Sequence, residues 1–289
     1  MLETRVAVTA GFCPGVRRAV DKVYALIEER TNPICTLGPI IHNETVVADL
    51  ESRGVRAVEL SELSELSPDT TVVIRSHGVG REVYRMIEEQ GLECVDVTCT
   101  FVKKIHRIVE EKSREGYHII IIGDASHPEV QGICGWCEAD YTVIRTKEEA
   151  EAFKCDKASR LCIVSQTTFN LNNFKEIVES LQELRYNEMA SNLAVLNTIC
   201  NATEMRQREA QSLAGQVDTM LVVGGRNSSN TQKLFEICQR ECRNTYYIQT
   251  PVDLDFDMFQ SSSCVGITAG ASTPKKIIEE VQKHVRVKF

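Results

Sequence analysis

The chain has 289 residues, of which 43% are hydrophobic and 26% charged, as in globular proteins with one large domain or two to three smaller ones. Its 33 Lys and Arg residues against 41 Asp and Glu residues give a net charge of −8, which argues against a nucleic-acid or anionic-membrane partner. The N-terminus has no apolar signal segment, and no apolar run is long enough to span a bilayer. We therefore expect a cytoplasmic protein.

Short β-rich runs alternate with amphipathic helical stretches along the whole chain. In chain order the sequence predicts a helix over residues 14–30, a strand over 72–75, helices over 81–90 and 101–115, strands over 119–122 and 161–164, helices over 174–184 and 202–214, a strand over 220–223, a helix over 232–240, a strand over 265–268 and a helix over 274–284. This alternation predicts an α/β fold with mostly parallel sheets.

A longer pattern begins at each of three cysteines: a helix, a strand with a polar loop, further α/β structure, and a second strand with a polar loop. The cysteines are Cys13, Cys99 and Cys200. The first loops carry His42, His127 and Ser228, which lie 29, 28 and 28 residues after the cysteines. The second loops carry His77, Thr167 and Ser272. The spacing predicts three α/β domains, at residues 1–98, 99–199 and 200–289, the last with a C-terminal tail; chance agreement among common α/β spacings is the alternative. Loops at the carboxyl ends of parallel strands are where such sheets bind ligands.

The three cysteines each stand where a helix would begin, a position that favours the thiolate form. Three thiolates cannot complete the four-coordinate shell of a structural zinc ion. They suit a [4Fe-4S] cluster with one iron left open.

Eight of the other cysteines in this twelve-cysteine chain have simpler interpretations. Cys134 and Cys137 form a CxxC pair that could be a dithiol switch or half of a zinc site, but no second CxxC completes it. Two cysteines four residues apart on a predicted helix are expected to be packing residues: Cys238 and Cys242. Four lie in or beside strand-like apolar runs and are expected to be buried: Cys35, Cys94, Cys162 and Cys264.

The loop residues form a set that can hydrogen-bond an oxyanion. The set comprises His42, His77, His127, Thr167, Ser228, Ser229, Asn230 and Ser272. The loops with Ser228 and Ser272 lead into helix N-termini, which favour phosphate, so the set predicts a diphosphate pocket. Glu129 is the only carboxylate inside a first-loop motif. It is either a first-turn helix residue or a group that handles protons at the open iron, with His127 or Thr167 as neighbours.

Eight short motifs run in order along nearly the whole chain. They are Gly11-Phe-Cys-Pro-Gly-Val16, Ile41-His-Asn43, Ser76-His-Gly-Val79, Val97-Thr-Cys99, Ser126-His-Pro-Glu-Val130, Gln166-Thr-Thr168, Asn227-Ser-Ser-Asn230 and Thr268-Ala-Gly-Ala-Ser272. Together they resemble the signature motifs of the 4-hydroxy-3-methylbut-2-enyl diphosphate reductases, the IspH/LytB family. The chain departs from many members at Pro14 and Thr100, which flank two of the cysteines without replacing them.

The resemblance implies three α/β domains in a pseudo-threefold trefoil around one central [4Fe-4S] cluster. It implies a two-electron, two-proton reductive dehydroxylation of an allylic diphosphate to isopentenyl and dimethylallyl diphosphates, the last step of the methylerythritol phosphate pathway. In that family's pattern Cys13, Cys99 and Cys200 hold the cluster. The loop set then binds substrate, with Glu129, His127 and Thr167 as catalytic residues, and ferredoxin or flavodoxin donates the electrons.

Two other functions stay open at this point. A redox sensor could carry the same cluster and diphosphate pocket without turnover. A thiol oxidoreductase could use Cys134 and Cys137 and carry no cluster.

Overall fold

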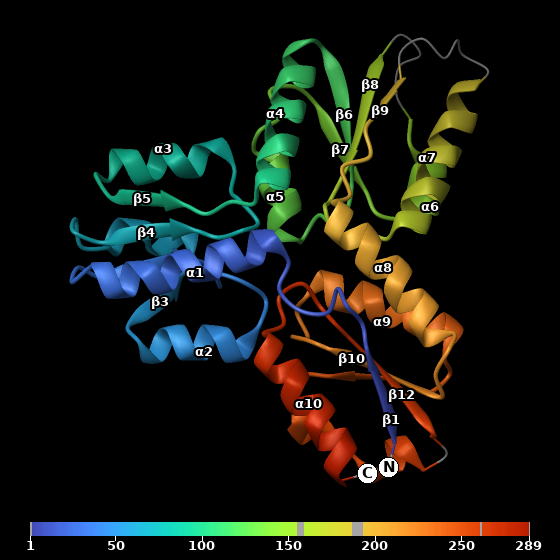
Figure 1. Cartoon of the computed structure of the whole chain (residues 1–289). Helices are drawn as coiled ribbons and strands as arrows, with labels where there is room; N and C mark the ends of the chain where they lie inside the picture. Colours follow the sequence, from blue (N-terminus) through green and yellow to red (C-terminus); the bar gives the residue numbers. More distant parts are fainter. Residues whose placement is uncertain (1, 155–158, 187–192, 261, 289) are drawn as a thin grey trace. The chain divides into compact units, whose positions relative to one another are not determined.

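The computed structural model describes residues 2–154, 159–186, 193–260 and 262–288. It contains three four-stranded sheets in which every described strand pair is parallel, so the predicted α/β class is confirmed. The chain divides into two compact units (Figure 1). Unit 1 comprises residues 1–24, 39–54 and 201–289, and unit 2 comprises residues 25–38 and 55–200.

Unit 2 holds two of the sheets. The first has the order β3-β2-β4-β5, with β2 (Ile34–Leu37), β3 (Val55–Val58), β4 (Thr71–Ile74) and β5 (Glu93–Asp96). Helix α3 (Arg81–Glu89) and the 3₁₀ segment η1 (Leu60–Glu65) pack on it through a core that includes Ile74 and Ile87. The central strands β2 and β4 are buried along their whole length, as expected for parallel strands covered on both faces.

The second sheet of unit 2 has the order β7-β6-β8-β9. Its strands are β6 (Tyr117–Ile122), β7 (Tyr141–Ile144), β8 (Arg160–Ser165) and β9 (Leu193–Val195). The helices are α4 (Thr100–Arg114), α5 (Pro128–Cys134), α6 (Lys147–Ala152) and α7 (Leu171–Tyr186). Helices α4 and α5 lie on one face of this sheet and α6 and α7 on the other (Figure 1). In β6, Ile119 and Ile121 join the core with α4 and α5, whereas Ile120 and Ile122 join the core with α6 and α7. The alternation of side chains along a strand thus places four consecutive isoleucines in two cores.

Unit 1 holds the third sheet, with the order β1-β12-β10-β11. Its strands are β1 (Glu3–Val6), β10 (Thr219–Val223), β11 (Thr245–Ile248) and β12 (Cys264–Ala269). The helices are α8 (Asn201–Ala214), α9 (Ser229–Glu241) and α10 (Lys275–Lys288), with 3₁₀ segments η3 (Pro251–Asp253) and η4 (Phe256–Phe259). Unit 1 also contains α2 (Glu44–Ser52), while α1 (Pro14–Glu29) begins in unit 1 and ends in unit 2.

The three sheets share one strand order, and β1, at the start of the chain, lies in the sheet formed by the C-terminal strands. If the third sheet is written β11-β10-β12-β1, β1 occupies the edge position that β5 and β9 occupy in the other two. Strand β1 pairs with β12 in the register Glu3↔Cys264 to Val6↔Ile267. Residues 3–6 therefore complete the C-terminal sheet and do not join the other strands of the predicted domain 1–98.

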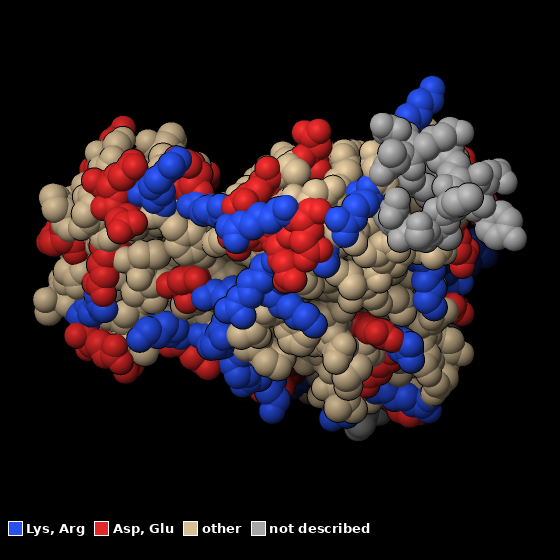
Figure 2. All heavy atoms as spheres, turned by 90° about the horizontal axis from the view of Figure 1, so that it is seen from above, with Lys and Arg blue, Asp and Glu red and all other residues tan. Residues whose placement is uncertain are grey.

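The predicted long elements are confirmed, with ends that differ by a few residues. The sequence did not reveal several short elements: β1, β2, α2, β3, β5, α5, β7, α6, β9 and β11. No described helix has the length and apolar character needed to cross a membrane. On the face drawn in Figure 2, basic side chains are bordered by acidic ones, in keeping with the many salt bridges between surface residues.

Candidate functional site

The predicted site residues occupy equivalent places at the carboxyl ends of the strands. His42, His127 and Ser228 each lie five residues after the last residue of β2, β6 or β10. His77, Thr167 and Ser272 follow β4, β8 and β12 within three residues. Cys13, Cys99 and Cys200 follow the edge strands β1, β5 and β9. The carboxyl end of a parallel sheet is the usual ligand-binding end, as the sequence predicts.

Each of the three cysteines directly precedes a helix. Cys13 precedes α1, and the N–H of Val16 in its first turn points to the Cys13 sulfur at 3.5 Å. Cys99 is the N-cap of α4, and Cys200 precedes α8. The N–H groups and dipole at a helix N-terminus stabilise a negatively charged sulfur, the form that binds metal.

One backbone hydrogen bond recurs at all three cysteines and ties each to a second loop. The N–H of Cys13 donates to Ala271 O at 3.2 Å, beside Ser272. The other two bonds run from Cys99 N to Ser76 O at 3.0 Å, beside His77, and from Cys200 N to Thr167 O at 3.2 Å. Each thiol is thereby fixed against the loop of the sheet whose edge strand precedes it.

In unit 1, Ser272, Ser228 and His42 are brought together. The Ser272 hydroxyl lies 3.1 Å from His42 O and 3.3 Å from the Ser228 hydroxyl. Ser228 is the N-cap of α9 and accepts from the N–H of Thr231 at 3.3 Å, and Ser229 is the first residue of that helix. The N-terminus of this 13-residue helix has the hydroxyl-bearing residues Ser228, Ser229 and Ser272 beside it, so it is suited to bind phosphate oxygens.

Asn230 connects this hydroxyl cluster to Cys13. Its Oδ1 accepts from Ala271 N at 2.9 Å, and Ala271 O in turn accepts from Cys13 N. Asn230 is 4% exposed, and its Nδ2 has no hydrogen-bond partner within the described residues. A buried amide donor without a partner is costly, so this atom is available to a bound anion.

In unit 2, His77 and His127 meet edge to face, with ring centroids 5.4 Å apart. His127 is the N-cap of α5, and its Nδ1 accepts from the N–H of Glu129 at 3.1 Å. A ring nitrogen that accepts a hydrogen bond carries no proton, so neutral His127 has its proton on Nε2. His127 can therefore donate one hydrogen bond from Nε2.

Glu129 is 2% exposed and is held by Thr167 alone among the described hydrogen-bond donors. The backbone N–H of Thr167 donates to Oε1 at 2.6 Å and its hydroxyl donates to Oε2 at 2.8 Å. Burial raises the pKa of Glu129 from 4.5 to about 7, and the two hydrogen bonds from Thr167 oppose this rise. A carboxyl group with a pKa close to neutrality is suited to deliver a proton.

The structure supports a packing role for most of the remaining cysteines. Cys134 and Cys137 pack into the core beside α5, and burial raises the pKa of Cys137 to about 12 and also raises that of Cys134. Cys238 and Cys242 are buried, as predicted. Because burial disfavours the thiolate form of Cys134 and Cys137, these two thiols are poor nucleophiles, which argues against dithiol chemistry by this pair.

The expectation for Cys94 is wrong. Cys35, Cys162 and Cys264 are buried as predicted, but Cys94 is exposed. The reason is that Cys94 lies on β5, the edge strand of its sheet, where only one neighbouring strand covers it.

Two residues with no signal in the sequence hold the site loops. Glu209 of α8 accepts hydrogen bonds from the N–H groups of Val8 and Thr9, at 2.6 and 2.8 Å, and so fixes the segment between β1 and Cys13. Trp136 donates from Nε1 to Val79 O at 2.9 Å, at the end of the loop that carries His77. A glutamate in a polar helix and a tryptophan within a CxxC pair carry no local signal for these contacts.

The donor set fits an iron–sulfur cluster better than a zinc ion. Its three thiols are fixed at helix N-termini, and each is braced by one backbone hydrogen bond. Soft sulfur ligands of this kind favour iron–sulfur chemistry.

The chain matches the family model described as LytB protein over residues 4–286. A 4-hydroxy-3-methylbut-2-enyl diphosphate reductase of Caldanaerobacter subterraneus subsp. tengcongensis is 45% identical over 286 residues, 99% of this chain and 97% of the relative. The enzyme of the same name from Alkaliphilus oremlandii is 45% identical over 278 residues, 96% of both chains.

Two solved structures agree with these relatives. The E-1-hydroxy-2-methyl-but-2-enyl-4-diphosphate reductase of Plasmodium falciparum superposes with a TM-score of 0.90 at 27% identity, over 99% of this chain and 87% of that one. An (E)-4-hydroxy-3-methyl-but-2-enyl diphosphate reductase, described as the terminal enzyme of the non-mevalonate pathway, superposes with a TM-score of 0.69 at 38% identity, over 99% of both chains. With its motifs, three sheets and matched site positions, the chain belongs to the LytB protein family.

Proposed function

We propose that this chain is a 4-hydroxy-3-methylbut-2-enyl diphosphate reductase. It converts the allylic alcohol diphosphate to isopentenyl and dimethylallyl diphosphates. In each turnover two electrons and two protons enter, the carbon–oxygen bond to the hydroxyl group breaks, and water leaves. The observation that carries the proposal is Glu129, a buried acid with a pKa of about 7 that Thr167 joins to the backbone of Cys200.

Cys13, Cys99 and Cys200 would hold one [4Fe-4S] cluster. When bound, the cluster supplies electrons one at a time and a Lewis-acidic iron that no thiolate occupies. The helix N-termini and the three backbone bonds described above keep these thiols in place. With these ligands, residues 1–98, 99–199 and 200–289 would form three domains around one cluster, and the edge strand 3–6 would belong to the third.

Glu129 would give a proton to the departing hydroxyl oxygen, so that water and not hydroxide leaves. Because burial raises its pKa to about 7, the carboxyl group can hold a proton for delivery near neutral pH. Thr167 orients both oxygens of the carboxyl group, and the Nε2–H of His127 offers a hydrogen bond to substrate. These three residues would thus serve proton delivery and substrate orientation together.

The diphosphate group would bind the hydroxyls and the α9 N-terminus in unit 1. Asn230 contributes the Nδ2 donor that has no other described partner, and Ser228, Ser229 and Ser272 contribute hydroxyls. The two imidazoles that complete the proposed shell are His42 and His77. Because most of these donors are neutral, the bound anion depends on hydrogen bonds and the helix N-terminus.

Ferredoxin or flavodoxin would supply the electrons, and the protein would work in the cytoplasm. No disulfide joins the eleven cysteines that the structure describes, in agreement with a reducing compartment.

The test is anaerobic purification followed by iron and sulfide analysis and by substrate-dependent oxidation of reduced methyl viologen. We expect about four irons per chain and turnover with the allylic diphosphate. Cys99→Ser is expected to lose the cluster. Its matched control is Cys94→Ser, at an exposed position of β5, the strand that precedes Cys99, and this variant is expected to keep the cluster. A cluster that binds substrate without viologen oxidation would favour the sensor function and refute the enzyme.

A further inference from the structure

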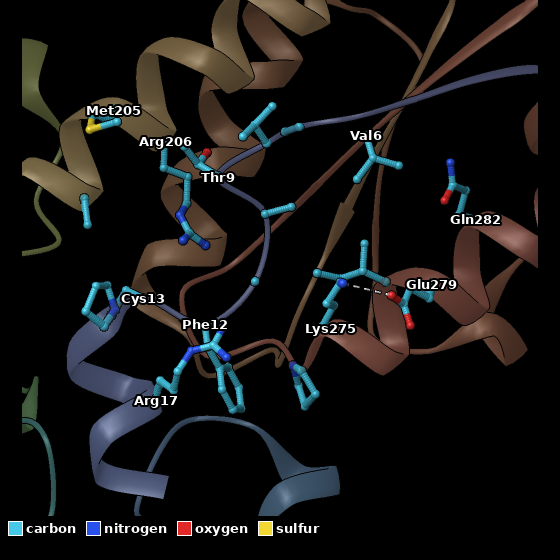
Figure 3. A pocket seen from close by; sticks show the side chains of 18 of the residues that line it. Val6, Thr9, Phe12, Cys13, Arg17, Met205, Arg206, Lys275, Glu279 and Gln282 are labelled. Atoms are coloured by element: carbon cyan, nitrogen blue, oxygen red, sulfur yellow. Dashed lines mark ion pairs between the residues drawn. The ribbon is translucent and has the colours of Figure 1, made fainter. Parts of the chain in front are cut away.

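A groove of about 810 Å³ lies in unit 1, and Cys13 is in its wall (Figure 3). Four segments line the groove: the chain from Val6 to Pro14, the first turns of α1, the start of α8, and the start of α10. We propose that this groove is the docking site of a small acidic protein that carries one electron. The inference rests on the proposed function, because it assigns to Cys13 the role of a cluster ligand.

Two exposed apolar side chains lie at the groove. Val8 is 93% exposed and Met205 is 61% exposed. The segment with Val8 is held by Glu209, which accepts hydrogen bonds from the N–H groups of Val8 and Thr9, so the exposed valine is presented by a fixed backbone. Apolar groups of this kind at the centre of a small contact area are typical of protein interfaces.

The groove is lined by three cations, Arg17, Arg206 and Lys275, and two carboxylates, Asp21 and Glu279, a net charge of +1 in a chain whose net charge is −8. Arg17 is exposed, lines the groove and makes no salt bridge with any described residue (Figure 3). Residues 14–22 of α1 carry three cations and one carboxylate. Lys275 is 82% exposed, and its 3.3 Å pair with Glu279 is a surface pair that a partner's carboxylate can replace at little cost.

The helices add to this positive field. The first residue of α1, the second of α8 and the first of α10 all line the groove: Pro14, Ala202 and Lys275. Three helix N-termini therefore face the groove with their partial positive charges. An acidic partner is favoured over a neutral or basic one, since complementary charge speeds encounter and orients the docked protein.

The location suits electron delivery because Cys13 is both a proposed cluster ligand and a wall residue of the groove. The rate of electron transfer falls steeply with distance, so a carrier seated there has a short path through the Cys13 sulfur. Each docking event would oxidise the carrier by one electron and reduce the cluster by one, and two events would serve one turnover.

The experiment compares the holoenzyme with three variants, using a purified acidic bacterial ferredoxin as the probe. Binding is measured by calorimetry at low and high salt, and turnover is measured with ferredoxin and with methyl viologen. Arg17→Glu and Lys275→Glu are each expected to weaken ferredoxin binding about tenfold at low salt, with a smaller effect at high salt. Val8→Ser is expected to weaken binding severalfold at both salt concentrations, because it removes apolar contact and no charge.

The matched control is Lys283→Glu, the same charge change at an exposed position of α10 that lines a different pocket. We expect its ferredoxin affinity to equal that of the unmodified protein, and viologen turnover to be unchanged in all four variants. Equal ferredoxin affinity in Arg17→Glu, Lys275→Glu and Lys283→Glu would refute the docking site. If the unmodified protein shows no viologen turnover, the proposed function is refuted, while the binding measurement still decides the docking site.

Discussion

Replacing Glu129 with glutamine separates proton delivery from assembly of the site. The side chain is 2% exposed and accepts only from Thr167 among the described donors, so glutamine fits the same space and can keep at least one of the two hydrogen bonds. The cluster ligands are unchanged, and we expect iron content and substrate binding to be retained. Turnover is expected to fall by about 10² to 10⁴, the usual effect of losing a positioned general acid.

The pH dependence of turnover tests the role of Glu129 as proton donor more directly. Because the pKa of Glu129 is about 7, viologen-driven turnover is expected to fall about tenfold for each pH unit above 7, as the proton donor is lost. Glu129→Gln is expected to lack this alkaline decline. A decline centred near pH 4.5, or an unchanged alkaline decline in Glu129→Gln, would show that another group delivers the proton.

The same group also affects stability. A carboxyl whose pKa rises from 4.5 unfolded to about 7 folded binds its proton more tightly in the folded state. Its stabilising contribution is complete below pH 4.5 and is lost as the pH rises to 7, by about 3 kcal/mol.

Urea unfolding at pH 5 and pH 8 measures this contribution. Glu129→Gln is expected to gain about 2 to 3 kcal/mol relative to the unmodified protein between the two pH values. The exposed control Glu82→Gln is expected to show no such gain. Equal pH dependence of the three proteins would mean that Glu129 titrates at its ordinary pKa.

Three further substitutions test the rest of the site. Asn230→Ala is expected to weaken substrate binding by about 1 to 3 kcal/mol, measured by calorimetry, because the bound diphosphate loses a buried donor; unchanged affinity would place the phosphate elsewhere. Trp136→Phe removes the hydrogen bond to Val79 O and is expected to lower the stability of the loop by about 1 kcal/mol, seen as faster amide exchange at residues 76–80; unaltered exchange would refute this role. Serine at both Cys134 and Cys137 is expected to leave the iron content unchanged, since both thiols pack in the core, and loss of iron would reassign the ligands.

Much of the fold could be predicted from the sequence because its signals are local. An isoleucine run such as residues 119–122 is short, apolar and β-branched, which favours a buried strand, and polar residues directly after such runs mark the carboxyl ends of strands. Equal spacing from Cys13, Cys99 and Cys200 then indicated three similar units. The short edge strands were missed because a four-residue segment such as 3–6 has no periodicity to detect.

The tertiary structure alone decided which segments pair and how the acid is tuned. Strand β1 pairs with β12, which lies more than 250 residues away in the chain. Because local sequence patterns carry no information over such a distance, the sequence could not place β1 in the last sheet. Glu129 is an ordinary first-turn helix residue by sequence. Its pKa of about 7 arises because packing removes water from its carboxyl group and leaves only the Thr167 donors, and desolvation is a property of the folded surroundings.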